Sequence, residues 1–393
     1  TTAVAISPDG VTLYVATYND SEATPTATLF ALSTKDHQNI RQATVPSQGP
    51  IEHIVFNPKG NLAVLYSNSG AHVHFLNIPA YMESQNNLDA FTKVPIPTPL
   101  DVEWTSDNTI AVLQSLPYTY ETCTAQPDSS IQMIDVPDDL NADTNLSVAL
   151  SIILTKYTSS IAADPATGRL FMSHPCTTEV SLNMAGASEV TPLLDYNQLS
   201  PCQRPVQLLA GKTYLYSTCH TMEDTISPTW SPAKLVIQRI SLATPTNDSL
   251  IRPLILPYSR EAFLFDAEIP PHGSYLQLLQ EPSSVLPLQL NLAVDGDKIA
   301  LLAEGYYASQ SINIVDGPTI NPTQRKSRSL VIIDPSSVSI THRFRAACYK
   351  VDNMFDYDLP LGGLDGNDCA PMENLETPDN EFLPLSIAAV FGK

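Results

Sequence analysis

The sequence AVAISPDGVTLYVAT, Ala3–Thr17, has the pattern of a strand, a Ser-Pro-Asp-Gly turn and a second strand. Alternating apolar residues favour half-buried strands, and Pro-Asp-Gly favours a tight turn between them. The same plan returns in IVFNPKGNLAVLYS, VEWTSDNTIAVLQ, IAADPATGRLFMS and LNLAVDGDKIALLAE, at residues 54–67, 102–114, 161–173 and 290–304. The chain is therefore predicted to be built from repeated hairpins.

The spacing of these hairpins predicts the architecture. The last inward apolar residue of each first strand falls at Ile6, Phe56, Trp104, Ala163, about Leu209, Val294 and Val390. Periods of about 40–50 residues with four short strands each are typical of β-propeller blades, and longer periods indicate insertions. We predict an all-β, seven-bladed propeller with four-stranded blades, of which the chain covers about six and the first strand of another. A rival count of six blades leaves residues 1–6 without a place.

These periods predict one propeller domain over residues 1–393. The expected blades span approximately 1–49, 50–97, 98–156, 157–200, 201–257 and 288–347, with another opening at 384–393. Two segments fall outside the repeat, an inserted hairpin over 258–287 and an acidic loop over 348–383. Only residues 80–89 and 38–41 are expected to form helical turns.

Charge and cysteine content narrow the classes of partner and compartment. With 20 Lys and Arg against 41 Asp and Glu, the formal charge of -21 repels nucleic-acid phosphates and anionic lipids. No apolar run approaches the roughly 18 residues of a membrane span, so no membrane insertion is expected within this segment. Six cysteines in polar, turn-rich contexts favour disulfides in an oxidising compartment, and six free cytosolic thiols are the alternative.

The repeat SPDGVTLYVAT and its variants resemble the YVTN-type repeats of bacterial and archaeal surface and periplasmic β-propellers, a group related in shape to the lactonase-like propellers. Blades three to six depart from the pattern, with TSDN, DPATG, AGK and VDGDK in place of the Ser-Pro-Asp-Gly turn. The resemblance implies a propeller in an extracellular, cell-surface or periplasmic location. It does not imply an activity, because propellers host many unrelated functions.

One face of the predicted disc gathers the cysteines and the long connections. In a four-stranded blade, the connections from the second to the third strand and from the fourth strand to the next blade share one face. Sequence alone allows 15 ways to pair six cysteines, and the blade topology favours three disulfides on this loop face, Cys202–Cys219, Cys348–Cys369 and Cys123–Cys176. It also receives the long segments 18–25, 115–129, 220–232, 306–326 and 349–383. Long loops on a rigid scaffold are where binding usually resides.

Two groups of residues on this face are candidate sites. Aromatic side chains in the long loops could anchor a partner, or could fold down over the blade edges: Tyr118, Tyr120, Trp230, Tyr306 and Tyr307. Oxygen-bearing side chains in the acidic loop could bind Ca²⁺, although the spacing is not that of an EF-hand, and a solvated acidic surface is the alternative: Asp356, Asp358, Asp365, Asn367 and Asp368.

The first strands line the centre of a propeller, and there His53, Asp101 and Glu103, with Ser160, are weak catalytic candidates. A His53–Asp101 pair on adjacent blades could act as a general base and its orienting acid. The alternative is a polar lining of a water-filled channel. His72 and His74 share a strand face and could hold a metal, but no third ligand is evident, and a solvated strand face is the alternative.

The sequence therefore supports two classes of function. The leading hypothesis is a non-enzymatic extracellular or cell-envelope propeller, a binding or structural module of a larger surface protein whose partner is a protein or polysaccharide. The alternative is a lactonase- or lyase-type enzyme with its site at the channel mouth. Histidines and carboxylates converging on the channel would favour the enzyme, whereas a lining of Ala, Ser and Val would favour the binding module.

Overall fold

The computed structural model describes residues 2–19, 26–36, 38–47, 49–83, 87–117, 120–125, 127–184, 187–195, 204–220, 234–243 and 250–257. After residue 257 it describes the backbone of strands alone, from β21 to β26. The predicted seventh blade at 384–393 and nearly all of the acidic loop lie outside the described residues.

Five antiparallel sheets have four strands each, and each is paired in sequence order. The first three contain β1 (Ala3–Ile6), β2 (Thr12–Asn19), β3 (Thr26–Ser33) and β4 (Asn39–Val45); β5 (His53–Phe56), β6 (Leu62–Tyr66), β7 (Val73–Asn77) and β8 (Phe91–Val94); and β9 (Pro99–Trp104), β10 (Thr109–Gln114), β11 (Ser129–Asp135) and β12 (Val148–Leu154). The next two contain β13 (Ser160–Asp164), β14 (Arg169–His174), β15 (Glu179–Met184) and β16 (Val190–Asp195); and β17 (Arg204–Ala210), β18 (Tyr214–His220), β19 (Lys234–Ser241) and β20 (Leu250–Pro257).

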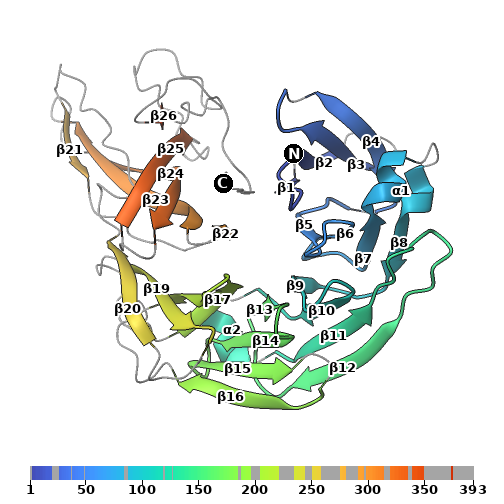
Figure 1. Cartoon of the computed structure of the whole chain (residues 1–393). Coiled ribbons are helices and arrows are strands. Elements are labelled where there is room, and N and C mark those ends of the chain that lie inside the picture. The colour runs from blue at the N-terminus through green and yellow to red at the C-terminus, as the bar shows by residue number, and fades with distance from the viewer. Residues whose placement is uncertain are drawn as a thin grey trace.

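The sixth sheet keeps the same order and adds two strands. Its blade consists of β22 (Asn291–Asp295), β23 (Lys298–Asn313), β24 (Thr319–Asp334) and β25 (Ser339–Cys348), while β21 (Tyr275–Leu279) pairs with β23 and β26 (Glu373–Asn374) pairs with β25. The sheets follow one another around an arc, with the first strand of each nearest the centre (Figure 1). The predicted all-β propeller architecture is confirmed, and the seventh blade stays a prediction.

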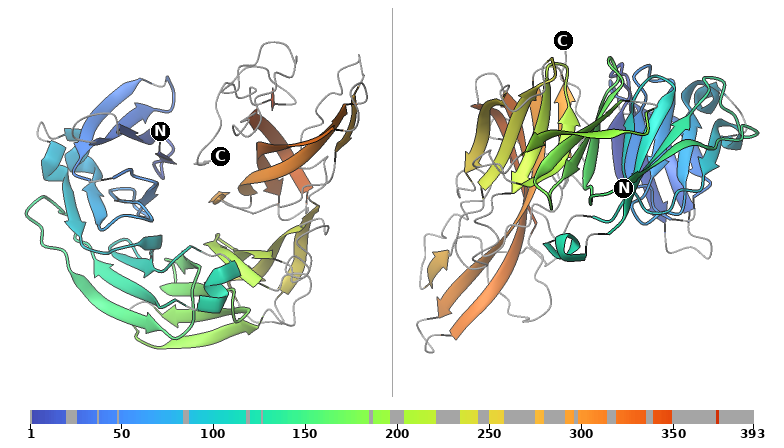
Figure 2. Two further views of the ribbon diagram at one scale, coloured as in Figure 1. Left: turned by 180° about the vertical axis from the view of Figure 1, so that it is seen from behind. Right: turned by 90° about the horizontal axis from the view of Figure 1, so that it is seen from below.

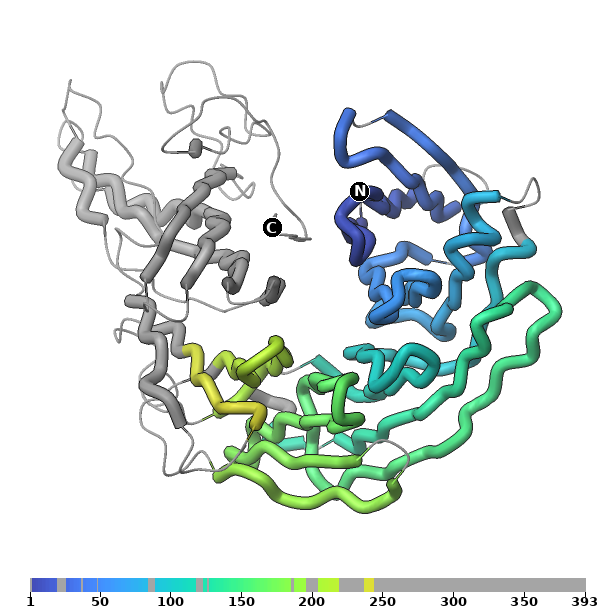
Figure 3. The backbone as a smooth tube through the Cα atoms, viewed as in Figure 1, coloured from blue at the N-terminus to red at the C-terminus, as the bar shows by residue number. Residues whose placement is uncertain are grey.

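The described landmark residues read from the sequence are the last or the penultimate residues of the inner strands. Ile6, Phe56 and Trp104 are the last residues of β1, β5 and β9, and Trp104 is buried. The chain passes from centre to rim within a blade before it returns to the centre for the next (Figure 3). The repeat period in the sequence is therefore the period of the blades.

The turn after the first inner strand is held by its own polar side chains. In the first blade the Ser7 hydroxyl donates to Asp9 Oδ1 at 2.5 Å, and the same carboxylate accepts the Val11 amide at 3.0 Å. Gly10 adopts φ +76°, and the equivalent Gly60 adopts φ +75°, a left-handed conformation that glycine adopts without strain. The Pro-Asp-Gly and Pro-Lys-Gly sequences thus form equivalent hairpin turns.

The apolar core lies between the blades. One buried cluster joins blades one and two, a second joins blades two and three, a third joins blades three and four, and a fourth joins blades four and five. Leu29 and Tyr81, for example, are fully buried in the first cluster, where the Tyr81 hydroxyl donates to the Leu29 carbonyl at 3.0 Å. Each blade is therefore stabilised by its neighbours, as expected of stacked repeat units.

The helical segments differ in part from the prediction. The expected turn at residues 80–89 is confirmed as helix α1 (Ile78–Glu83) and the 3-10 helix η1 (Asn87–Ala90). The expected turn at 38–41 is wrong, because residues from Asn39 onward pair with β3 as strand β4. Helix α2 (Tyr120–Ala125) was not expected from the sequence.

The second correction concerns residues 306–326, which were expected to form a long loop. Residues 306–313 and 319–326 are the outer halves of β23 and β24, which pair residue by residue from Ile299–Ile333 to Asn313–Thr319. Antiparallel pairing satisfies backbone groups that a loop of this length would leave to water. Within the expected hairpin at 258–287, strand β21 pairs with β23. The partner strand expected at 262–270 lies outside the described residues, so the hairpin stays a prediction.

Candidate functional site

The loop face is the surface formed by the connections from second to third strand and from fourth strand to the next blade. Helix α2 and the outer end of the β23–β24 hairpin project from the same side of the disc (Figure 2). The opposite face carries the short turns after the inner strands, but also two longer connections, residues 78–90 and 136–147. These two connections are joined by hydrogen bonds from Asn77 Nδ2 to the Leu140 carbonyl at 2.8 Å and from the Ala142 amide to the Asp89 carbonyl at 3.1 Å.

A disulfide between Cys123 and Cys176 ties neighbouring blades on the loop face. Cys123 lies in α2, between β10 and β11, and Cys176 lies between β14 and β15, with the two Cα atoms 5.1 Å apart. The bond closes a sequence separation of 53 residues and confirms one of the three predicted pairs. Cys202 and Cys369 lie outside the described residues, so the other two pairs stay predictions.

A buried polar network lies beside this disulfide. His174 is 2% exposed, and its Nδ1 lies 3.1 Å from Thr158 Oγ1. Burial lowers the pKa of His174 to about 4, so the ring is neutral at neutral pH. The Tyr157 hydroxyl donates to the Leu116 carbonyl at 2.8 Å, and the Thr158 amide donates to Ser129 Oγ at 3.1 Å. The α2 connection is thus held to blade four by hydrogen bonds as well as by the disulfide.

At the centre of the ring, the carboxylate of Asp101 joins blade three to blade four. Its Oδ2 accepts the Ser160 hydroxyl at 2.8 Å and the Ile161 amide at 2.9 Å, and its Oδ1 accepts the Val102 amide at 2.9 Å. Ser160 Oγ accepts the Leu208 amide of blade five at 3.1 Å. Burial raises the pKa of Asp101 even though these hydrogen bonds act to lower it. Asp101 and Ser160 were both predicted to line the channel. In the structure their hydrogen bonds connect blades three, four and five.

Glu103 lies two residues further along the same strand and is also a channel residue. Burial, and then the charge of Asp101, raise its pKa well above the usual range of a carboxyl group. Burial and the charges of Asp101, Glu103 and Glu52 raise the pKa of Tyr66 well above its ordinary value. Acidic groups from blades two and three therefore share one poorly solvated region.

His53 contacts Tyr66, whereas Asp101 contacts residues of blade four. Its ring stacks on Tyr66 with the centroids 4.5 Å apart and the planes 16° from parallel. Burial lowers the pKa of His53, an effect that the charge of Glu52 opposes. His53 and Asp101 thus both belong to the central region, but the contacts of Asp101 run to blade four and those of His53 to Tyr66.

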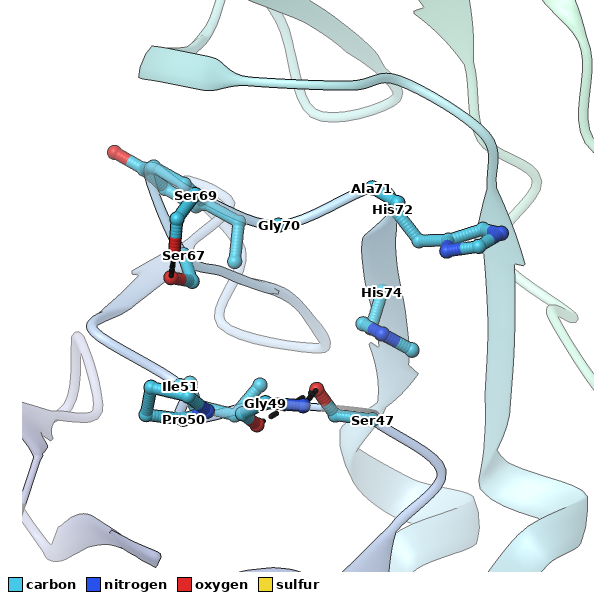
Figure 4. A pocket seen from close by; sticks show the side chains of 11 residues that line it. Ser47, Gly49, Pro50, Ile51, Ser67, Ser69, Gly70, Ala71, His72 and His74 are labelled. Atoms are coloured by element: carbon cyan, nitrogen blue, oxygen red, sulfur yellow. Dashed lines mark hydrogen bonds between the residues drawn. The ribbon is translucent and has the colours of Figure 1, made fainter.

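A cavity of about 300 Å³ opens on the loop face between blades one and two (Figure 4). One wall is the connection from β4 to β5, and the other is the connection from β6 to β7. Its lining residues are Ser47, Gly49, Pro50, Ile51, Tyr66, Ser67, Ser69, Gly70, Ala71, His72 and His74. No pattern in the sequence predicts this cavity, because its two walls come from segments about 20 residues apart.

His74 is the residue that sequence reasoning placed wrongly. A metal pair or a solvated strand face was expected, but His74 is 5% exposed, because β7 is the third strand of blade two and all of its residues are buried. Burial, with the nearby His72 and Lys93, lowers the pKa of His74 to about 4. The rings of His72 and His74 lie 6.3 Å apart, centroid to centroid.

Most other predicted site residues lie where side chains are not described. Tyr120 begins α2, and Tyr306 and Tyr307 lie in strand β23, where only the backbone is described. Outside the described residues altogether are Tyr118, Trp230, Asp356, Asp358, Asp365, Asn367 and Asp368. Within the described part of the chain, no three His, Cys, Asp or Glu side chains are grouped so that they could hold a metal ion. In that same part, no helix is long and apolar enough to span a membrane.

Comparison with known proteins gives a likeness of fold. No family model and no curated protein sequence matches the chain. Among solved structures, the β-propeller domain of Myceliophteria thermophila Cps50 (Swd1) is 10% identical with a TM-score of 0.48, and the match covers 88% of this chain and 92% of that one. Kuenenia stuttgartiensis hydrazine synthase is 11% identical with a TM-score of 0.40, over 75% of this chain and 79% of that one.

Proposed function

We propose that this chain is a non-enzymatic binding module, a single propeller domain of a larger extracellular or cell-envelope protein that presents its loop face to a protein or polysaccharide. The observation that carries the proposal is the Cys123–Cys176 disulfide, which fixes a connection of blade three to one of blade four on that face. Disulfides persist in oxidising compartments, which supports the extracellular assignment. A fixed loop loses less conformational entropy when a partner binds, which favours affinity.

The charge of the chain supports the choice of partner. A formal charge of -21 disfavours polyanions and favours neutral or basic surfaces. The predicted aromatic anchors Tyr118, Tyr120, Trp230, Tyr306 and Tyr307 belong to this proposal as contact residues, and Ca²⁺ bound by the acidic loop would order a further segment of the same face.

The test blocks one face at a time. The protein is screened against arrays of glycans and of secreted proteins, and the ligand found is then measured against two conjugates. Ala71→Cys carries a polyethylene glycol maleimide on the loop face, and Ala166→Cys carries it on the opposite face; both alanines are exposed. We expect the Ala71 conjugate to lose binding and the Ala166 conjugate to keep it. The reverse pattern would contradict the proposal.

A second candidate function is supported by the channel carboxylates. The raised pKa values of Asp101 and Glu103 suit a general acid, as a lactonase- or lyase-type enzyme would require. His53 would belong to the same site. Turnover of lactone or uronate substrates that Glu103→Gln abolishes, with the fold intact by circular dichroism, would favour this enzyme over the binding module.

A further inference from the structure

The cavity between blades one and two is the feature that the channel and the disulfide leave unexplained. Its volume of about 300 Å³ equals the lower end of the range for small-molecule sites in proteins. It lies on the same loop face as the disulfide, since its walls are connections of the two kinds that form that face. The position and volume of the cavity thus fit a small ligand with a single ring.

The polar groups of the cavity are hydroxyls and imidazoles rather than charges. The lining contains no Asp, Glu, Lys or Arg. The nearest carboxylate, that of Glu52, accepts the Ser67 hydroxyl at 2.7 Å and the Asn68 amide at 2.9 Å, so it is engaged behind the wall. An ionic ligand would find no opposite charge here, whereas a neutral ligand rich in hydroxyl groups would find both donors and acceptors.

The serine hydroxyls are held in place by their own hydrogen bonds. The Ser47 hydroxyl donates to the Gly49 carbonyl at 2.9 Å. Because Ser67 donates to Glu52, the 3.2 Å contact between Ser67 and Ser69 leaves Ser69 as the donor. Each oxygen still has lone pairs, so the walls present fixed acceptors before any ligand arrives.

His74 has a buried polar atom that needs a partner. Its ring lies between His72 and Ser47 in the cavity (Figure 4). Nδ1 is buried and has no hydrogen-bond partner in the described structure, and buried polar atoms without partners are rare because each one costs stability. With a pKa of about 4 the ring is neutral at neutral pH, so it offers one donor and one acceptor.

We propose that this cavity binds the terminal unit of a neutral carbohydrate, with His74 and the wall serines as hydrogen-bonding residues. The proposal rests on the proposed function and deepens it, because it names a carbohydrate as the ligand class and blade two as the place of contact. In one wall, Gly70 permits the tight turn from Ser67, since a Cβ at residue 70 would lie 3.0 Å from the Ser67 carbonyl oxygen.

The test uses glucose, galactose, mannose and N-acetylglucosamine as probes. Saturation-transfer difference NMR detects binding, and titration gives the dissociation constant for the wild type, His74→Ala, Ala71→Trp and Ala166→Trp. The tryptophan at 71 fills the cavity mouth from an exposed position, so it keeps the test valid if His74→Ala fails to fold. The tryptophan at 166 is the matched control on the opposite face.

We expect at least one sugar to bind the wild type. The affinity should fall about tenfold or more in His74→Ala, which corresponds to the loss of one hydrogen bond. Ala71→Trp should not bind the sugar, and Ala166→Trp should bind it as the wild type does. The proposal is overturned if no sugar binds or if Ala71→Trp binds as the wild type does. Stoichiometric binding of Zn²⁺ that is lost in both His72→Ala and His74→Ala would also overturn it, by making the pair a metal site. Failure here leaves the face-blocking test with a protein ligand unaffected, so the two proposals fail separately.

Discussion

Removal of the Cys123–Cys176 disulfide should destabilise the protein by an amount that its sequence separation sets. In the loop-entropy relation, a cross-link over 53 residues removes about 14 cal/mol/K of entropy from the unfolded chain. At 25 °C this corresponds to about 4 kcal/mol of the free energy of unfolding. The double variant C123S/C176S should lose close to this value.

Chemical denaturation followed by tryptophan fluorescence measures the loss, under conditions that leave the other cysteines in their native state. The pair C123A/C176A is the matched control, because agreement between the serine and alanine pairs assigns the loss to the bond and not to the new side chain. A loss under about 0.5 kcal/mol, the range of an ordinary surface substitution, would contradict a stabilising role of this disulfide.

Three further predictions follow from the channel and from the parts of the chain outside the described residues. The pKa of Glu103 is raised in the folded state, so the contribution of this carboxyl group to stability is full below its pKa in the unfolded chain and is lost as pH rises through its folded pKa. Glu103→Gln should therefore raise the melting temperature at neutral pH and flatten the fall of the melting temperature between pH 4 and neutrality. An unchanged pH profile in this variant would contradict the prediction. Intact-mass analysis after thiol labelling should find all six cysteines paired, whereas labelled cysteines in the native protein would contradict the remaining pairs Cys202–Cys219 and Cys348–Cys369. Ca²⁺ bound by residues 356–368 should raise the free energy of unfolding by about 2.7 kcal/mol at a hundredfold excess over the dissociation constant, so the melting temperature should be higher in Ca²⁺ than in Mg²⁺ at equal ionic strength. Coincident melting curves would mean a solvated acidic loop.

The blade plan could be predicted from sequence because its signals are local. A turn such as that at Ser7–Gly10 carries its own hydrogen bonds, and the next blade repeats the same chemistry. The Cys123–Cys176 pair could be predicted for a related reason: once the strands were assigned, topology placed both cysteines on one face of adjacent blades.

Features that depend on packing between blades could not be predicted. Nothing in the sequence around His74 distinguishes a buried strand from a half-solvated one, because burial there is set by the neighbouring blade. Asp101 and Ser160 were both expected in the channel, yet their hydrogen bond joins residues 59 positions apart in sequence. The outer halves of β23 and β24 are polar strands without a buried-face pattern, so they resemble a loop in sequence.

Hydrogen–deuterium exchange with and without the array-identified ligand tests whether the loop face is the binding face. If it is, the ligand slows exchange in residues 47–51, 67–74 and 115–129, which form the cavity walls and the α2 connection. Exchange in the turns at 7–11, 57–61 and 105–108 should be unchanged. Protection confined to those turns, with residues 47–51 and 67–74 unaffected, would contradict it.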